Sequence, residues 1–139
     1  MAFLLKKGPQ VIEYWPKKVS TTMTANSAVQ PDGSGFLTNA TAGATKIFGI
    51  LQVNIASTDA DFASATKVPV LIPQDTNEFE ADVTGTLTTA MVGETRDLSS
   101  ALTVDAAGTS HNQVTIAAFI SATKAIVKIN SAYSYKNAA

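Results

Sequence analysis

Glu78-Phe79-Glu80-Ala81-Asp82-Val83-Thr84-Gly85-Thr86-Leu87 alternates apolar and polar side chains more regularly than any other part of the chain. Apolar side chains stand at positions 79, 81, 83 and 87, and acidic residues or threonines stand between them. A period of two is typical of a β-strand with one buried face and one solvated face. We therefore expect a strand over 78–87 whose outer face is acidic.

The segments before this stretch also predict strands rather than helices. Residues 46–56 are apolar on both faces and predict a long central strand. Gly49 in its interior indicates a bulge, a bend or the close approach of another backbone. Residues 67–73 resemble a strand too, but Pro69 and Pro73 lack N–H donors, so the pattern favours an edge or a bulge.

The segments after it complete an all-β pattern. Residues 114–121 and 125–130 are apolar and predict a hairpin joined at 121–124. Strands separated by Gly, Asp and Asn at regular spacing indicate a small antiparallel β-barrel or sandwich. The sequence shows no βαβ alternation, no internal repeat and no coiled-coil heptad. The residues expected in the core are Phe79, Val83, Ile116, Ile120, Val127 and Ile129.

Residues 1–18 differ from the rest of the 139-residue chain. They contain four lysines and one glutamate, and Pro9 and Pro16 disfavour a helix or a central strand. We therefore expect an extended N-terminal arm over 1–18 and one β-barrel domain over 19–139. The alternative is that the segment contains a strand of the same domain, with Trp15 as a core residue.

The arm has the composition of a docking segment. Tyr14 and Trp15 adjoin, and aromatic side chains commonly dominate interface energies, whereas exposed lysines mainly change association rates. We expect the arm to bind another protein through the two aromatic residues, with the lysines secondary. The candidate interface residues are Lys6, Lys7, Tyr14, Trp15, Lys17 and Lys18.

No motif for catalysis, a cofactor or a metal is found. The chain has no cysteine, which excludes disulfides and thiolate sites. His111 is the single histidine, and its neighbour Ser110 would point away from it in extended chain. One histidine without cysteine does not supply a usual zinc ligand set, and the acidic row at 78, 80 and 82 lies along one strand face instead of encircling a cation. We predict no enzymatic activity, no cofactor and no metal.

The charge content favours a protein partner over nucleic acid or a membrane. The formal net charge is −1, so no global basic field is present, and no run of apolar residues is long enough to span a membrane. Charged residues make up 15% of the chain, below the average of about 25% for soluble domains. Surfaces poor in charge are typical of permanent interfaces. Because 46–56 and 114–130 are apolar on both faces, they need cover from barrel closure or from another copy, and we expect a homotrimer.

The order of features points to a known family. The features are the lysine- and proline-containing N-terminal stretch, the strands at 46–51 and 68–73, the alternating stretch at 79–85, Val92-Gly93 with Asp97-Leu98, and the closing hairpin at 119–129. In this order, and best over residues 40–130, the chain resembles the small capsid decoration, or cement, proteins of tailed bacteriophages. The resemblance implies a β-barrel or β-tulip-like domain, often trimeric, that binds an icosahedral head where capsomers meet.

The function expected from this resemblance is structural. Such a protein binds the outer surface of the head and holds neighbouring major capsid proteins together. Its location would be the virion surface, after synthesis in the host cytoplasm. The alternatives are another virion component, such as a tail-tube, head-completion or fibre-associated protein, or a cellular binding module.

Overall fold

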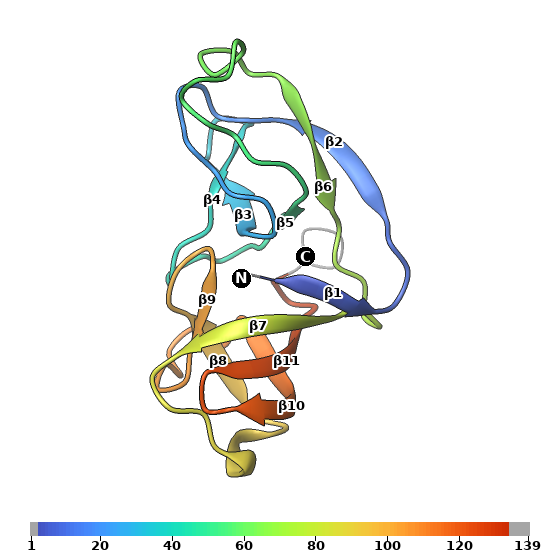
Figure 1. Ribbon diagram of the computed structural model, residues 1–139, viewed down its shortest axis with the longest axis vertical. Coiled ribbons are helices and arrows are strands. Elements are labelled where there is room, and N and C mark those ends of the chain that lie inside the picture. The colour runs from blue at the N-terminus through green and yellow to red at the C-terminus, as the bar shows by residue number, and fades with distance from the viewer. Residues whose placement is uncertain (1–2, 134–139) are drawn as a thin grey trace.

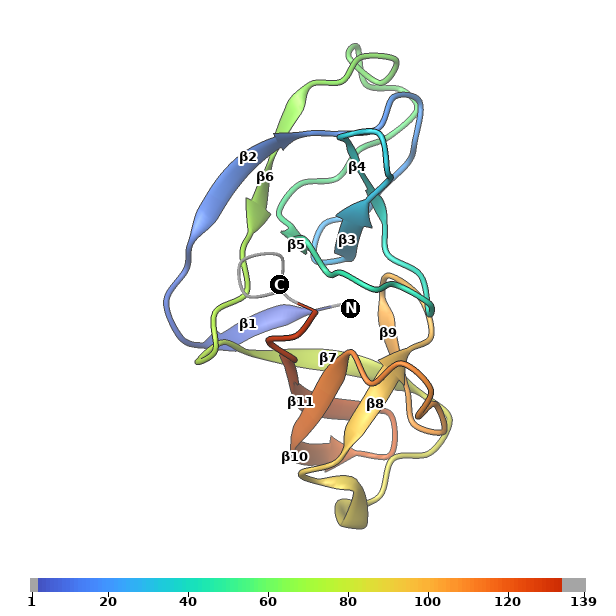
Figure 2. The same cartoon turned by 180° about the vertical axis from the view of Figure 1, so that it is seen from behind.

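The computed structural model describes residues 3–133, which form two β-sheets stacked along the long axis of the molecule (Figures 1 and 2). The only helical element in the described chain is the short 3₁₀ helix η1 (Thr89–Met91). The predicted all-β class is thereby confirmed. The strands are β1 (Leu4–Lys7), β2 (Ile12–Pro16), β3 (Ala28–Pro31), β4 (Leu37–Asn39), β5 (Gly49–Leu51), β6 (Lys67–Leu71), β7 (Glu78–Thr84), β8 (Thr95–Leu98), β9 (Thr103–Asp105), β10 (Val114–Ser121) and β11 (Lys124–Ile129).

Strands β7 to β11 form a closed barrel, called here the C-terminal barrel. Its strand order is β7-β11-β10-β8-β9, and β9 returns to pair with β7. That closing contact is parallel and joins Asp82–Thr84 to Thr103–Asp105, whereas the other pairings in the barrel are antiparallel. Strand β1 adds to the first half of β7, antiparallel, beside the position of β9. A small, mainly antiparallel barrel is what the sequence predicts.

Strands β2 to β6 form the second unit, called here the N-terminal sheet. Its order is β2-β6-β5-β3-β4, with all neighbours antiparallel. A single parallel bridge between Lys17 and Leu37 connects the end of β2 to β4. The sheet thus curls until its first and last strands meet, but only at one point.

The two units repeat one connectivity. When the strands of each unit are counted along the chain, both orders read first, fifth, fourth, second, third, and the first strand meets the third in parallel. The pairing registers also coincide, which shows that the molecule is a structural repeat that sequence inspection did not detect. The matched pairs are Pro16↔Lys67 with Asp82↔Lys124, Leu51↔Val70 with Ile116↔Val127, Val29↔Gly49 with Arg96↔Val114, and Pro31↔Leu37 with Leu98↔Val104.

A backbone detail before the second strand of each unit supports the repeat. Asn26 and Gly93 occupy corresponding places, and both have positive φ, 67° and 89°. Glycine and asparagine are the residues that adopt this region at least cost. The N–H of Asn26 bonds to the carbonyl of Leu51, and the N–H of Gly93 bonds to the carbonyl of the corresponding Ile116. The same turn is therefore built twice with different residues.

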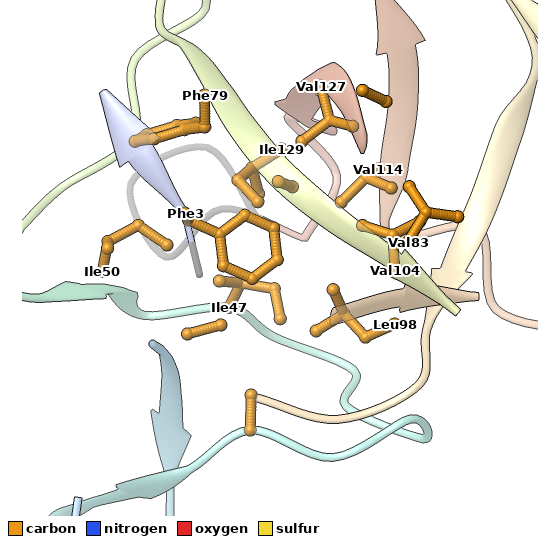
Figure 3. Close-up of a cluster of buried hydrophobic side chains, with 14 of the residues drawn as sticks. Phe3, Ile47, Ile50, Phe79, Val83, Leu98, Val104, Val114, Val127 and Ile129 are labelled. Carbon is orange, nitrogen blue, oxygen red and sulfur yellow. The ribbon is translucent and has the colours of Figure 1, made fainter. Parts of the chain in front are cut away.

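The two units pack against each other through their hydrophobic cores. One cluster, the main core, fills the C-terminal barrel and extends to Phe3, Ile47 and Ile50 (Figure 3). A second cluster fills the N-terminal sheet and includes Leu51 and Val70. Ile50 and Leu51 thus face different cores, so the apolar faces of 46–56 are covered within one chain. This cover does not require another copy of the protein.

The N-terminal segment is not a separate arm in the described residues. Residues of β1 pair with β7, residues of β2 pair with β6, and the Phe3 side chain is only 1% exposed, inside the main core. The predicted boundary at residue 18 is therefore wrong, and the alternative of an intradomain strand is correct. The physical reason is that β7 offers an unpaired edge and the main core has room for Phe3. Residues 1–2 and 134–139 of the predicted arm and domain lie outside the described chain.

Two strand predictions, those over 46–56 and 67–73, need correction. The long strand expected over 46–56 is reduced to β5, and Gly49 is required because a side chain there would collide with the Leu71 carbonyl of β6. This confirms close backbone approach as the role of Gly49. Strand β6 lies between β2 and β5, not at an edge. Pro69 is tolerated because β5 ends at Leu51, leaving the ladder beside it short.

One core prediction is also wrong. Ile120 is 44% exposed, whereas the other five residues expected in the core are buried. The register of β10 against β11 shifts twice, after Ile116 and after Phe119. Each bulge inserts a residue and breaks the alternation of faces, so Ile120 leaves the barrel interior.

Candidate docking surface

Strand β2 runs along the outside of the molecule (Figure 1), and it and the residue before it carry exposed apolar side chains, called here the exposed stripe. Tyr14 is 64% exposed, and Val11 and Ile12 are each 37% exposed. Because side chains alternate across a strand, Ile12 and Tyr14 share the outward face while Trp15 points inward. Exposed large apolar side chains gathered on one strand are typical of a contact surface. Tyr14 was predicted from the sequence, whereas Val11 and Ile12 were not; alternation along 12–14 would have indicated Ile12, and Val11 is exposed just before the strand begins.

Trp15 has a structural role. Its ring packs edge-on against Phe48, with 4.8 Å between ring centroids, and its Nε1 donates a hydrogen bond to Glu13 Oε1 at 3.0 Å. It belongs to the margin of the core inside the N-terminal sheet. Trp15 and Phe48 also line an apolar cavity of about 270 Å³ at this end of the sheet. Most of the Trp15 ring is therefore committed to the fold rather than to a partner.

Lys17 is not an interface residue. Its side chain is 1% exposed, and Nζ donates to the carbonyls of Asp61, Phe62 and Ser64 at 3.0, 3.1 and 2.6 Å. A buried ammonium is stable only when its donors are satisfied, and this loop supplies three acceptors. The basic character of the segment predicted a solvated lysine, but Lys17 ties the loop after β5 to the sheet.

The other predicted lysines remain at the surface. Lys6 Nζ lies 3.7 Å from Glu80 and Lys7 Nζ lies 3.9 Å from Glu78, across the β1–β7 pair. Both side chains are about half exposed or more, so these ion pairs contribute little to stability. Lys18 is exposed beyond the other end of β2, where Lys67 pairs in register with Pro16. Exposed lysines therefore stand at both ends of the exposed stripe, and those at the β1 end lie 3.7 and 3.9 Å from glutamates of β7.

A buried carboxylate organises the loop that contains His111. Asp97 accepts hydrogen bonds from the main-chain N–H groups of Ser110, His111 and Asn112 at 2.5 to 3.0 Å. Burial alone would raise the pKa of Asp97, but the three donors together outweigh it, so the pKa lies below its usual value. His111 is thus held by its backbone in a structural loop. Within residues 3–133, no cluster of three His, Asp or Glu side chains with metal-binding geometry occurs.

The candidate surface therefore consists of Ile12 and Tyr14 on β2 and of Val11 just before it, with exposed lysines at its two ends. In the described chain no helix is long and apolar enough to cross a membrane. No protein-family model matches the chain, and no curated protein matches it.

Proposed function

We propose that this protein is a capsid decoration, or cement, protein that binds the outer surface of an icosahedral phage head through strand β2. One observation carries the proposal: Tyr14 is 64% exposed beside Val11 and Ile12, on a strand that pairs firmly with β6. Rigid, exposed aromatic and aliphatic side chains are the usual anchors of an interface. The resemblance in feature order to phage decoration proteins supplies the partner, which is the major capsid protein.

Such a protein acts by binding energy alone. Contacts made across a joint between capsomers favour the joined state by mass action, and no reacting group is required. Because many copies act on one shell, modest affinity for each copy is sufficient. The lysines at both ends of β2 would speed association with an acidic surface.

We further propose that the protein acts as a homotrimer on the virion surface, after synthesis in the host cytoplasm. Two features support association between copies: the low charge content and a group of exposed large apolar residues outside the exposed stripe. That group consists of Val92, Phe119 and Ile120.

The test is binding to phage heads that lack this protein. Tyr14→Ala is expected to weaken co-sedimentation with the heads by about 30-fold, because loss of an aromatic anchor costs about 2 kcal/mol. Its unfolding midpoint should stay close to that of the wild type, since the Tyr14 side chain is mostly exposed. Leu102→Ala, which removes an apolar side chain that is 38% exposed away from β2, is the matched control. Heads decorated equally by Tyr14→Ala and the wild type would exclude the surface.

A further inference from the structure

The repeat makes it possible to compare corresponding strand edges. In the C-terminal barrel, the edge of β7 that faces away from β11 is fully used: β1 pairs with its first half and β9 with its second half. On that first half, Glu80 pairs with Leu4 and Glu78 pairs with Lys7. The part of the β7 edge that β9 leaves free is thus filled by a strand from outside the repeat.

Strand β2 is the counterpart of β7, and its corresponding edge is used only in part. Its C-terminal end meets β4 through the bridge between Lys17 and Leu37. Along its first half, where β1 would pair in the repeat, no strand of residues 3–133 adds to β2. By register, Ile12 corresponds to Glu78 and Tyr14 corresponds to Glu80.

The main chain of β2 shows which groups face this open edge. The Ile72 N–H donates to the Val11 carbonyl, and the Lys17 N–H donates to the Thr66 carbonyl, so odd-numbered residues bond toward β6. Strand geometry alternates, so the N–H and C=O of Ile12 and Tyr14 face the other way. Unused ladder groups beside exposed apolar side chains form a template for strand addition.

We propose that this open edge of β2 accepts an extended strand of a partner protein, antiparallel, as β7 accepts β1. The side chains define the chemistry of that strand. On β7 the glutamates face the lysines of β1, whereas on β2 the corresponding residues are Ile12 and Tyr14. The partner strand therefore carries uncharged, apolar side chains opposite these two residues.

Charge separates such a partner from a second copy of this chain. Lys7, which is mostly exposed and only weakly paired with Glu78 at 3.9 Å, lies beyond one end of β2, and Lys18 and Lys67 lie at the other end. Two β2 strands paired antiparallel would bring the Lys7 end of each copy toward the Lys18 end of the other, with repulsion. A partner strand with carboxylates at its two ends would instead be attracted. The inference rests on the proposed function only for the partner's identity, which would be the major capsid protein.

A defined peptide tests the edge without a capsid. The probe is acetyl-Glu-Val-Thr-Val-Thr-Val-Glu-amide, an extended sequence with an apolar face and acidic ends. At saturation, hydrogen exchange of the Ile12 and Tyr14 amides should slow about tenfold or more, since each gains a hydrogen bond. Exchange of the Glu13 and Trp15 amides, which face β6, should not change. Absence of slowing at Ile12 and Tyr14, or slowing confined to other strands, would overturn the proposal.

A proline substitution separates the main-chain contribution from the side chain. Ile12→Pro removes the edge donor without removing a bond to β6, and Pro16 already occupies an edge position of the same parity. Peptide affinity should fall about tenfold in Ile12→Pro and stay within about twofold in Ile12→Val. Equal affinity of a folded Ile12→Pro variant would contradict strand addition. If Ile12→Pro unfolds, the exchange measurement on the wild-type chain decides.

Binding to phage heads and hydrogen exchange with the peptide, measured together, distinguish a failure of this inference from a failure of the proposed function. Slowed exchange with the peptide, but no binding to heads, would support the edge and overturn the capsid assignment. Binding to heads that leaves the Ile12 and Tyr14 amides unprotected would overturn the edge and retain the function. A dimer in analytical ultracentrifugation, with the same amides protected in the absence of peptide, would make a second copy the occupant and overturn the partner proposed here.

Discussion

The N-terminal sheet and the C-terminal barrel share strand order and register but close differently. The barrel closes through three consecutive parallel pairs, and the sheet closes through one bridge. At the closing position the barrel has Val83 in its core, whereas the sheet has Lys17, whose ammonium is bound by three loop carbonyls. The same backbone arrangement therefore accepts an apolar or a cationic side chain at one position, provided that loop carbonyls accept the hydrogen bonds of the cation.

The two units also differ in how polar their inner faces are. Phe79 is fully buried in the barrel, and its counterpart by register is Glu13, which accepts a hydrogen bond from Trp15. In the barrel, β1 covers the part of the β7 edge that β9 leaves free, whereas the corresponding edge of β2 stays open. The C-terminal barrel supplies most of the main core, and the N-terminal sheet carries the exposed stripe.

Substitutions at the counterparts Phe79 and Glu13 test the difference between the two inner faces, and they should change stability most. Phe79→Ala should lower the free energy of unfolding by about 3 to 5 kcal/mol, from lost burial and the cavity left behind. Glu13→Ala at the corresponding place should cost less, because it removes polar contacts, among them the bond from Trp15, and opens no apolar cavity in the main core. Urea unfolding followed by tryptophan fluorescence measures both. Equal losses for the two variants would show that the inner faces are not as different as the burial indicates.

A smaller effect is expected at the closing position. Lys17→Met keeps most of the side-chain volume but leaves three loop carbonyls without their donor, and should cost about 2 kcal/mol. Lys18→Met, one residue away and exposed, is the control and should change stability by less than about 0.5 kcal/mol. Thermal or urea unfolding gives the difference. A Lys17→Met variant as stable as the wild type would mean that water replaces the ammonium at no cost.

The smallest effect compares corresponding polar residues, Asp97 in the barrel and Gln30 in the sheet. Asp97 has a lowered pKa in the folded state, so its contribution is complete above the unfolded value of about 3.9 and is lost as pH falls through the folded value. Asp97→Asn should therefore cost about 1 to 2 kcal/mol at pH 7, and this cost should shrink below about pH 4. Gln30 binds the N–H of Thr41 and does not titrate, so the cost of Gln30→Ala should be independent of pH. Urea unfolding from pH 7 to about pH 2.5 provides the check, and a cost of Asp97→Asn that stays constant with pH would contradict the role of the charge.

Strands with one buried and one exposed face could be predicted from the sequence. Strand β7 and the β10–β11 hairpin follow directly from alternation and turn residues. The repeat could not be predicted from the sequence, because corresponding residues need to share only backbone geometry. Asn26 and Gly93 both adopt positive φ, whereas the side chains of Glu13 and Phe79 have nothing in common. Similarity of register is not similarity of sequence.

The candidate surface was predicted in part for a related reason. The composition of 1–18 drew attention to Tyr14, Trp15 and the lysines, and of these Tyr14 is exposed whereas Lys17 is buried. Which face of a strand turns inward depends on its neighbour, and β6 follows some fifty residues later in the chain. Trp15 and Lys17 could therefore not be assigned to the interior from their own segment.

Strand β1 imposes an order on the folding of this protein during synthesis. It leaves the ribosome well before β7, the strand with which it pairs among residues 3–133, which begins at Glu78. At about 5 to 20 residues per second, the delay between them is roughly 4 to 14 s. During this time Phe3, Leu4 and Leu5 have no barrel to enter, so the C-terminal barrel is completed only when its last strands have been made. A fusion tag placed before Phe3 would act on this final step, which makes the N-terminal end of the described chain the less suitable place for one.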